Sequence, residues 1–130
     1  MYKRQIGDSS NILRARAHED INLITLLVGA EESGLEVQNT EGNWIPIEAK
    51  SKSIVCNIGD MMQLVTRSQL KSTSHRVIDH NASSSASRYS MPFFLHPSPE
   101  IDLCSIVDDS TESISAHDFL EERLKAIKLY

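Results

Sequence analysis

Two residues with metal-binding side chains, His18 and Asp20, lie near the beginning of the chain and are separated by Glu19. In an extended strand successive side chains point to opposite faces, so His18 and Asp20 would project to the same side. A further histidine, His75, lies well downstream in a segment that reads as another strand. Two imidazoles and one carboxylate form the facial triad that binds non-haem iron(II) and leaves positions open on the metal. The three residues together predict an iron site.

A pair of anion-binding side chains, Arg88 and Ser90, follows on the last strongly strand-like segment. They stand at positions i and i+2 and therefore share a face of that strand. A guanidinium binds a carboxylate through two parallel, charge-assisted hydrogen bonds, and a hydroxyl can add a third. The charges of iron(II), Asp20, a dicarboxylate and Arg88 sum to zero, which a buried site tolerates far better than an unbalanced set. The pair therefore predicts an anchor for a dicarboxylate co-substrate.

Each of these residues has a plainer explanation when it is taken singly. One His-x-Asp tripeptide occurs by chance in many proteins, and a lone histidine is more often a surface or hydrogen-bonded structural residue. The ordered set of His-x-Asp, His and Arg-x-Ser on strands is what makes the site specific. Other polar residues are given no role in it. His80, His96 and His117 lack ligand-like spacing, and Arg76 is expected in a surface ion pair. Arg14 could line the site, but it is expected to face solvent.

The elements that must position these residues read as short strands separated by turn signals. Beyond the opening strand that carries His18, strands are predicted at 23–28, 35–38, 44–47, 53–58, 72–78 and 88–95. Residues 39–43 have the composition of a hairpin turn, and Pro46 suits an edge strand. Residues 61–65 are too short and too compatible with a strand to be assigned as a helix. Met61, Met62 and Leu64 are expected in the core, although they could also line the floor of the pocket. From Ser115 the pattern changes to one amphipathic helix. The class predicted is all-β, with a C-terminal helix packed outside.

Length and composition place the chain among single globular domains. It has 130 residues, of which 40% are hydrophobic and 24% charged. A net charge of −5 argues against a nucleic-acid partner, and no apolar run is long enough to span a membrane. Cys56 and Cys104 have no paired spacing, which favours a reducing, cytoplasmic setting.

Five segments between Ala17 and Leu103 carry a further signal through their order along the chain. They are Ala17-His18-Glu19-Asp20, Gly34-Leu35-Glu36-Val37, Asn57-Ile58-Gly59-Asp60-Met61-Met62-Gln63, Ser72-Thr73-Ser74-His75-Arg76-Val77 and Arg88-Tyr89-Ser90-Met91-Pro92-Phe93-Phe94. In this order they resemble the C-terminal catalytic half of the isopenicillin N synthase-like iron(II)/2-oxoglutarate oxygenases. The resemblance implies a double-stranded β-helix (jelly-roll) core that is incomplete at its N-terminus.

The same resemblance implies a role for each candidate residue. His18, Asp20 and His75 would bind iron(II), while Arg88 and Ser90 would bind the C5 carboxylate of 2-oxoglutarate. The implied reaction uses O2 to hydroxylate, desaturate or cyclise a small organic substrate, and it converts 2-oxoglutarate to succinate and CO2. No nucleic-acid or membrane partner is implied, and the oligomeric state is left open.

The sequence departs from the family pattern in two respects. Glu19 replaces the usual threonine between the first two ligands, and the helical region and first core strand that members carry upstream are missing. Residues 1–5 also match the translation of a common sequencing adapter. We therefore expect a truncated fragment, with residues 1–11 artefactual or disordered, 12–104 a partial oxygenase core, and 105–130 a linker and C-terminal helix.

Three alternatives stay open at this point. The first is a non-haem iron oxidase of the same fold that uses no 2-oxoglutarate. The second is a β-sandwich binding module without catalytic activity, and the third is a fragment that is inactive whatever its parent does.

Overall fold

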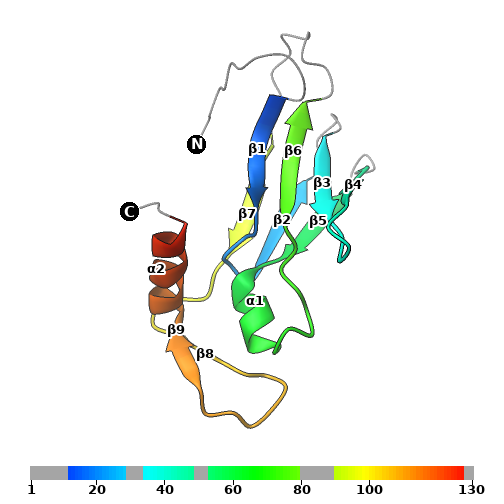
Figure 1. Cartoon of the computed structure of the whole chain (residues 1–130). Helices are drawn as coiled ribbons and strands as arrows, with labels where there is room; N and C mark the ends of the chain where they lie inside the picture. Colours follow the sequence, from blue (N-terminus) through cyan, green and yellow to red (C-terminus); the bar gives the residue numbers. More distant parts are fainter. Residues whose placement is uncertain (1–11, 29–33, 49–52, 80–89, 128–130) are drawn as a thin grey trace. The chain divides into compact units, whose positions relative to one another are not determined.

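The computed structural model describes residues 12–28, 34–48, 53–79 and 90–127 (Figure 1). Within the chain, contacts concentrate in two compact units. Unit 1 comprises Met1–Glu19, Leu27–Val55 and Thr73–Pro92, and unit 2 comprises Asp20–Leu26, Cys56–Ser72 and Phe93–Tyr130.

Unit 1 is built on a four-stranded antiparallel sheet with the order β1-β6-β3-β4. Its strands are β1 (Ile12–His18), β6 (His75–Asp79), β3 (Leu35–Gln38) and β4 (Trp44–Pro46). The predicted hairpin turn between β3 and β4 is confirmed: the Asn39 side chain accepts hydrogen bonds from the backbone N–H groups of Glu41 and Asn43, and Gly42 has a φ of +85°. Pro46 lies on the end strand β4, as predicted, where its missing N–H costs no central ladder bond.

Side-chain ion pairs link β6 to both of its neighbours in this sheet. Arg14 on β1 contacts Asp79 at 2.7 Å, and Arg76 contacts Glu36 on β3 at 2.7 Å. The Arg76 guanidinium also lies over the Trp44 ring, 4.2 Å from its centroid. The ion pair expected for Arg76 is therefore confirmed, but its expected place on the surface is wrong, because Glu36 is only 8% exposed. The expectation that Arg14 faces solvent is wrong, because its side chain is 25% exposed and is held by the Asp79 carboxylate.

A second sheet has three strands in the order β5-β2-β7. They are β5 (Ile54–Ile58), β2 (Ile24–Val28) and β7 (Pro92–Leu95), and each falls within a segment predicted as a strand. All four residues of β7 are exposed. The first two residues of the predicted strand 88–95 lie outside the described residues.

Unit 2 contains the two helices and a short two-stranded hairpin. Its elements are α1 (Asp60–Val65), β8 (Asp102–Cys104), β9 (Ser113–Ser115) and α2 (Ala116–Ala126). Met61, Val65, Leu103 and Ala116 form its buried apolar cluster. The core assignment is confirmed for Met61, whereas Met62 and Leu64 are partly buried and pack against the cluster. The helix α1 and the hairpin β8–β9 do not follow from the sequence pattern, because each is too short to show a period.

The C-terminal helix α2 begins where the sequence predicts. The Ser115 hydroxyl accepts a hydrogen bond from the backbone N–H of Asp118 at 3.0 Å, which caps the first turn. None of the helices in the described part of the chain combines the length and apolar character needed to cross a membrane.

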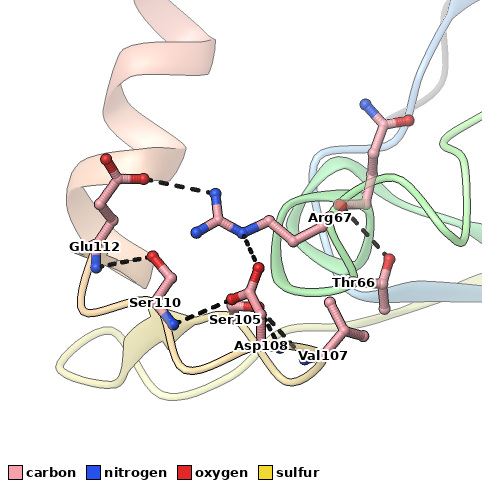
Figure 2. A network of polar contacts seen from close by, with 8 residues as sticks. Thr66, Arg67, Ser105, Val107, Asp108, Ser110 and Glu112 are labelled. Atoms are coloured by element: carbon pink, nitrogen blue, oxygen red, sulfur yellow. Dashed lines mark hydrogen bonds and ion pairs between the residues drawn. The ribbon is translucent and has the colours of Figure 1, made fainter.

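The loop between β8 and β9 is organised by polar contacts around Arg67, which follows α1 (Figure 2). The Arg67 guanidinium contacts Asp108 at 3.3 Å and Glu112 at 3.5 Å. Ser105 and Ser110 accept hydrogen bonds from backbone N–H groups of the same loop. Both cysteines of the chain, Cys56 and Cys104, are free and exposed.

Candidate metal centre

Two of the three predicted ligands, His18 and His75, are direct partners in the antiparallel ladder between β1 and β6. Residues opposite one another in such a ladder project to the same face of the sheet. Their ring centroids lie 4.3 Å apart, and the ring planes are inclined by 53°. The sheet of unit 1 therefore presents two imidazoles side by side.

Each of these rings is oriented by a backbone carbonyl two residues earlier in the chain. Nδ1 of His18 lies 2.7 Å from the Arg16 oxygen, and Nδ1 of His75 lies 3.1 Å from the Thr73 oxygen. A carbonyl oxygen only accepts hydrogen bonds, so in a neutral ring this geometry favours the tautomer with the proton on Nδ1 and the lone pair on Nε2. Histidines that bind metals commonly donate their other ring N–H to a carbonyl in this way.

The third predicted ligand, Asp20, lies past the end of β1, so strand alternation does not set its direction. Its side chain is buried, with 7% of the residue exposed. Its backbone oxygen accepts a hydrogen bond from Asp60 N–H at 2.8 Å, at the start of α1. The carbonyls of Ile21 and Asn22 accept from Met61 N–H, both at 3.2 Å. The first turn of α1 therefore fixes the backbone that carries the Asp20 carboxylate.

A close contact between Asn22 and Gly59 makes this arrangement possible. A Cβ atom at position 59 would collide with the Asn22 backbone oxygen and with its side-chain oxygen. Asn22 itself cannot withdraw, because only 1% of it is exposed and its side-chain amide donates to the Ile24 oxygen and the Thr25 hydroxyl. Position 59 therefore requires glycine.

The ligand set fits iron(II) by its chemistry. His18, Asp20 and His75 each offer one ligand atom, and these atoms all lie within 4.8 Å of one another. No other group of three such residues occurs among the described residues. Two imidazole nitrogens with one carboxylate oxygen are the donors of a facial triad, which leaves coordination positions for further ligands.

The structure describes only one of the two residues that are predicted to anchor the co-substrate. Ser90 is exposed and stands two residues before β7, whereas Arg88 lies outside the described residues. Of the histidines given no role, His96 is exposed, and His117 contacts Glu121 at 3.5 Å. His80 lies outside the described residues.

Four supporting features of the centre do not appear among the sequence-based candidates. They are the Arg16 and Thr73 carbonyls, the Asn22 side chain and the glycine at position 59. A backbone carbonyl leaves no side-chain signal at all. The Asn-Ile-Gly-Asp segment at 57–60 does mark the position of Gly59, although its contact with Asn22 is tertiary.

Comparisons with known proteins show which family this chain resembles. The model of the 2OG-Fe(II) oxygenase superfamily matches residues 2–97. The 2-oxoglutarate-dependent dioxygenase citB of Monascus ruber is 45% identical over 92 residues, which cover 70% of this chain and 25% of that protein. Feruloyl CoA ortho-hydroxylase 2 of Arabidopsis thaliana is 40% identical over 84 residues, covering 64% of this chain and 22% of that protein.

A solved structure extends the likeness to the fold. A full-length Neurospora crassa protein, solved in complex with alpha-KG, superposes with a TM-score of 0.76 at 28% identity, over 88% of this chain and 38% of that one. The predicted all-β class with a C-terminal helix, and its relation to the double-stranded β-helix, are confirmed. The chain spans about a quarter of the length of the curated relatives it matches. The chain belongs to the 2OG-Fe(II) oxygenase superfamily.

Proposed function

We propose that this chain carries the metal centre of an iron(II)- and 2-oxoglutarate-dependent oxygenase that oxidises a small organic substrate with O2. In this proposal His18, Asp20 and His75 hold the iron, and Arg88 with Ser90 binds the C5 carboxylate of 2-oxoglutarate. The observation that carries the proposal is the grouping of three ligand atoms within 4.8 Å in a chain of this superfamily. Iron(II), when bound with 2-oxoglutarate and O2, supplies an oxidant strong enough to attack a C–H bond and releases succinate and CO2.

The protein's own contribution is to hold and orient the ligands. The Arg16 and Thr73 carbonyls, which accept hydrogen bonds at Nδ1, favour neutral imidazoles that have their lone pairs on Nε2. Asp20 offers a charged oxygen from a backbone segment that α1 fixes. With Asp20 as its one carboxylate ligand, a bound iron(II) would keep a net positive charge, which would favour binding of an anionic co-substrate. A guanidinium at Arg88 would neutralise the far carboxylate of that co-substrate.

The finer parts of the proposal rest on sequence and on named relatives. The relatives are named for feruloyl CoA hydroxylation and for binding of alpha-KG, which supports a small organic substrate and 2-oxoglutarate for this chain. We further propose membership of the isopenicillin N synthase-like subgroup, a cytoplasmic location and no nucleic-acid partner. Residues 12–104 are proposed as the oxygenase core, and residues 105–130 as a linker and C-terminal helix.

The direct test is metal and co-substrate binding without oxygen. Anaerobic addition of iron(II) and 2-oxoglutarate should produce the weak visible charge-transfer band of a chelated keto acid. His75→Ala should abolish the band, because two ligands hold the metal poorly. His96→Ala is the matched control, since His96 is exposed and outside the ligand group, and it should retain the band. Absence of the band in the unaltered chain, or its persistence in His75→Ala, would count against the assignment.

A second variant tests the co-substrate anchor separately from the metal. Arg88→Gln should retain metal binding, measured with Co(II), and should weaken 2-oxoglutarate binding about tenfold or more because a charge-assisted pair is lost. Succinate formed in proportion to O2 consumed would exclude an oxidase that uses no keto acid. Metal binding with no effect of Arg88→Gln on 2-oxoglutarate would favour that oxidase instead.

A further inference from the structure

The strand β1 contains more residues than the strand it pairs with. Ile12 and Leu13 pair with Asp79 and Ile78, but the next partners are Ala15 with Val77 and then His18 with His75. The register therefore shifts twice, and each shift adds one residue to β1. An unshifted ladder would place Arg16, and not His18, opposite His75.

An extra residue in one strand releases backbone groups from the ladder. At a β-bulge the added residue is left unpaired, so its N–H or C=O can bond elsewhere. The second shift falls between Ala15 and His18, where the Arg16 carbonyl bonds to the His18 ring at 2.7 Å. The carbonyl that orients His18 therefore lies within the irregular part of the strand.

The two histidines stand at opposite ends of their strands, which explains why only β1 needs an irregularity here. His75 is the first residue of β6, so Thr73 precedes the strand and its carbonyl is available to the His75 ring. His18 is the last residue of β1, so the residue two positions before it lies inside the strand. In a regular ladder that carbonyl would point toward a neighbouring strand or away from the ring.

We propose that the second register shift of β1 is a positioning device for the metal centre: it releases the Arg16 carbonyl, which holds His18 by Nδ1 and leaves Nε2 as the ligand. Arg16 is thus a positioning residue that acts through its backbone. The inference rests on the proposed function of His18 as a ligand, and it adds how the chain prepares that ligand before any metal binds.

The first test needs neither metal nor a variant. Two-dimensional 1H–15N NMR of the metal-free chain at about pH 8 distinguishes the neutral histidine tautomers. His18 and His75 are expected to carry the proton on Nδ1, whereas the exposed His96 should favour Nε2. A His18→Gln spectrum assigns the signal. Protonation of His18 mainly on Nε2 would overturn the inference.

The second test removes each extra residue in turn. Deleting Ala17 makes the ladder regular from Ala15 to His18 and keeps His18 opposite His75. The affinity for Co(II), followed by its visible absorption, should fall about 10-fold to 100-fold, as for the loss of other groups that orient a metal ligand. Deleting Arg14 removes the first shift only and is the matched control, with Co(II) affinity within about 3-fold of the unaltered chain.

The outcomes separate the two proposals. Equal Co(II) affinity after deletion of Ala17, with His18 still protonated on Nδ1, would overturn the positioning role and leave the metal site standing. Failure of the unaltered chain to bind Co(II) would overturn the proposed function. If a deletion variant lacks a cooperative melt, the tautomer of His18 in the unaltered chain decides the inference.

Discussion

Different kinds of contact stabilise two regions of the molecule: the sheet of unit 1, which carries the two histidines, and unit 2, which carries the helices. In the sheet of unit 1 the buried apolar side chains are Leu35 and Ile78, and the linked side chains are charged pairs across β6. In unit 2 Met61, Val65, Leu103 and Ala116 form one apolar cluster. A strand that must present imidazoles has fewer positions left for apolar packing. The comparison therefore teaches that hydrogen-bonded register holds the ligands, whereas apolar burial stabilises the helices.

The largest effect that tests this contrast is expected in the apolar cluster. Met61→Ala should lower the free energy of unfolding by about 2–5 kcal/mol, because Met61 is 1% exposed and its loss leaves a cavity. Met91→Ala is the matched control: Met91 is 76% exposed, and its truncation should cost under about 0.5 kcal/mol. Urea denaturation measures both. Similar costs for the two variants would remove the contrast.

A smaller loss of stability is expected when the ion pair between Arg123 and Asp60 in unit 2 is broken. Arg123 on α2 contacts Asp60, a carboxylate that is 6% exposed. Arg123→Gln removes the cation from a buried anion and should cost about 1–3 kcal/mol in thermal or urea denaturation. The control Lys125→Gln breaks the exposed Lys125–Glu121 pair and should cost about 0.3–0.5 kcal/mol. A cost for Arg123→Gln no greater than this control would show that the pair contributes little.

In the sheet of unit 1, replacement of Arg76 should lower the free energy of unfolding by less than replacement of Arg123. Arg76→Gln removes a part-buried ion pair with Glu36 and the contact with the Trp44 ring, for an expected loss of about 1 kcal/mol. Trp44 is the single tryptophan of the chain, so its fluorescence emission should change directly. Unchanged emission and unchanged stability would mean that β3 and β6 are held by their ladder alone.

The smallest effects concern exposed carboxylates whose pKa the structure lowers. The hydrogen bond from Lys125 holds the pKa of Glu121 below its ordinary value, and the Ser105 hydroxyl does the same for the pKa of Asp108. A lowered folded-state pKa stabilises the protein above the unfolded-state pKa, and this stabilisation is lost as the pH falls through the folded-state value. NMR titration of Glu121 should show its pKa rising toward the ordinary value in Lys125→Gln. An unchanged midpoint would exclude Lys125 as the cause.

Local features of the fold could be predicted because their signals are local. Alternation marks residues 35–38, turn chemistry marks Asn39 to Asn43, and a capping serine marks the start of α2. The helix α1 could not be predicted, because its six residues depend on carbonyls at 20–22 that accept from its first turn. The hairpin β8–β9 is equally short, with three residues in each strand.

The same distinction between local and tertiary signals applies to the candidate metal centre. The types and order of His18, Asp20 and His75 can be read from the sequence, because ligand chemistry belongs to side chains. Their alignment cannot, since it depends on two extra residues in β1 that no side-chain pattern marks. The ion pair of Arg14 with Asp79 is likewise tertiary, because the partners are far apart in the chain and meet only through the strand pairing.

The contact between Gly59 and Asn22 has a consequence for how this sequence can change over time. Any side chain at position 59 would displace the Asn22 backbone, and with it the adjacent carbonyls that receive the amides of α1. A single methyl group there would therefore act on Asp20, although it touches neither that carboxylate nor the histidines. In this chain the position of the carboxylate therefore depends on a residue that has no side chain at all.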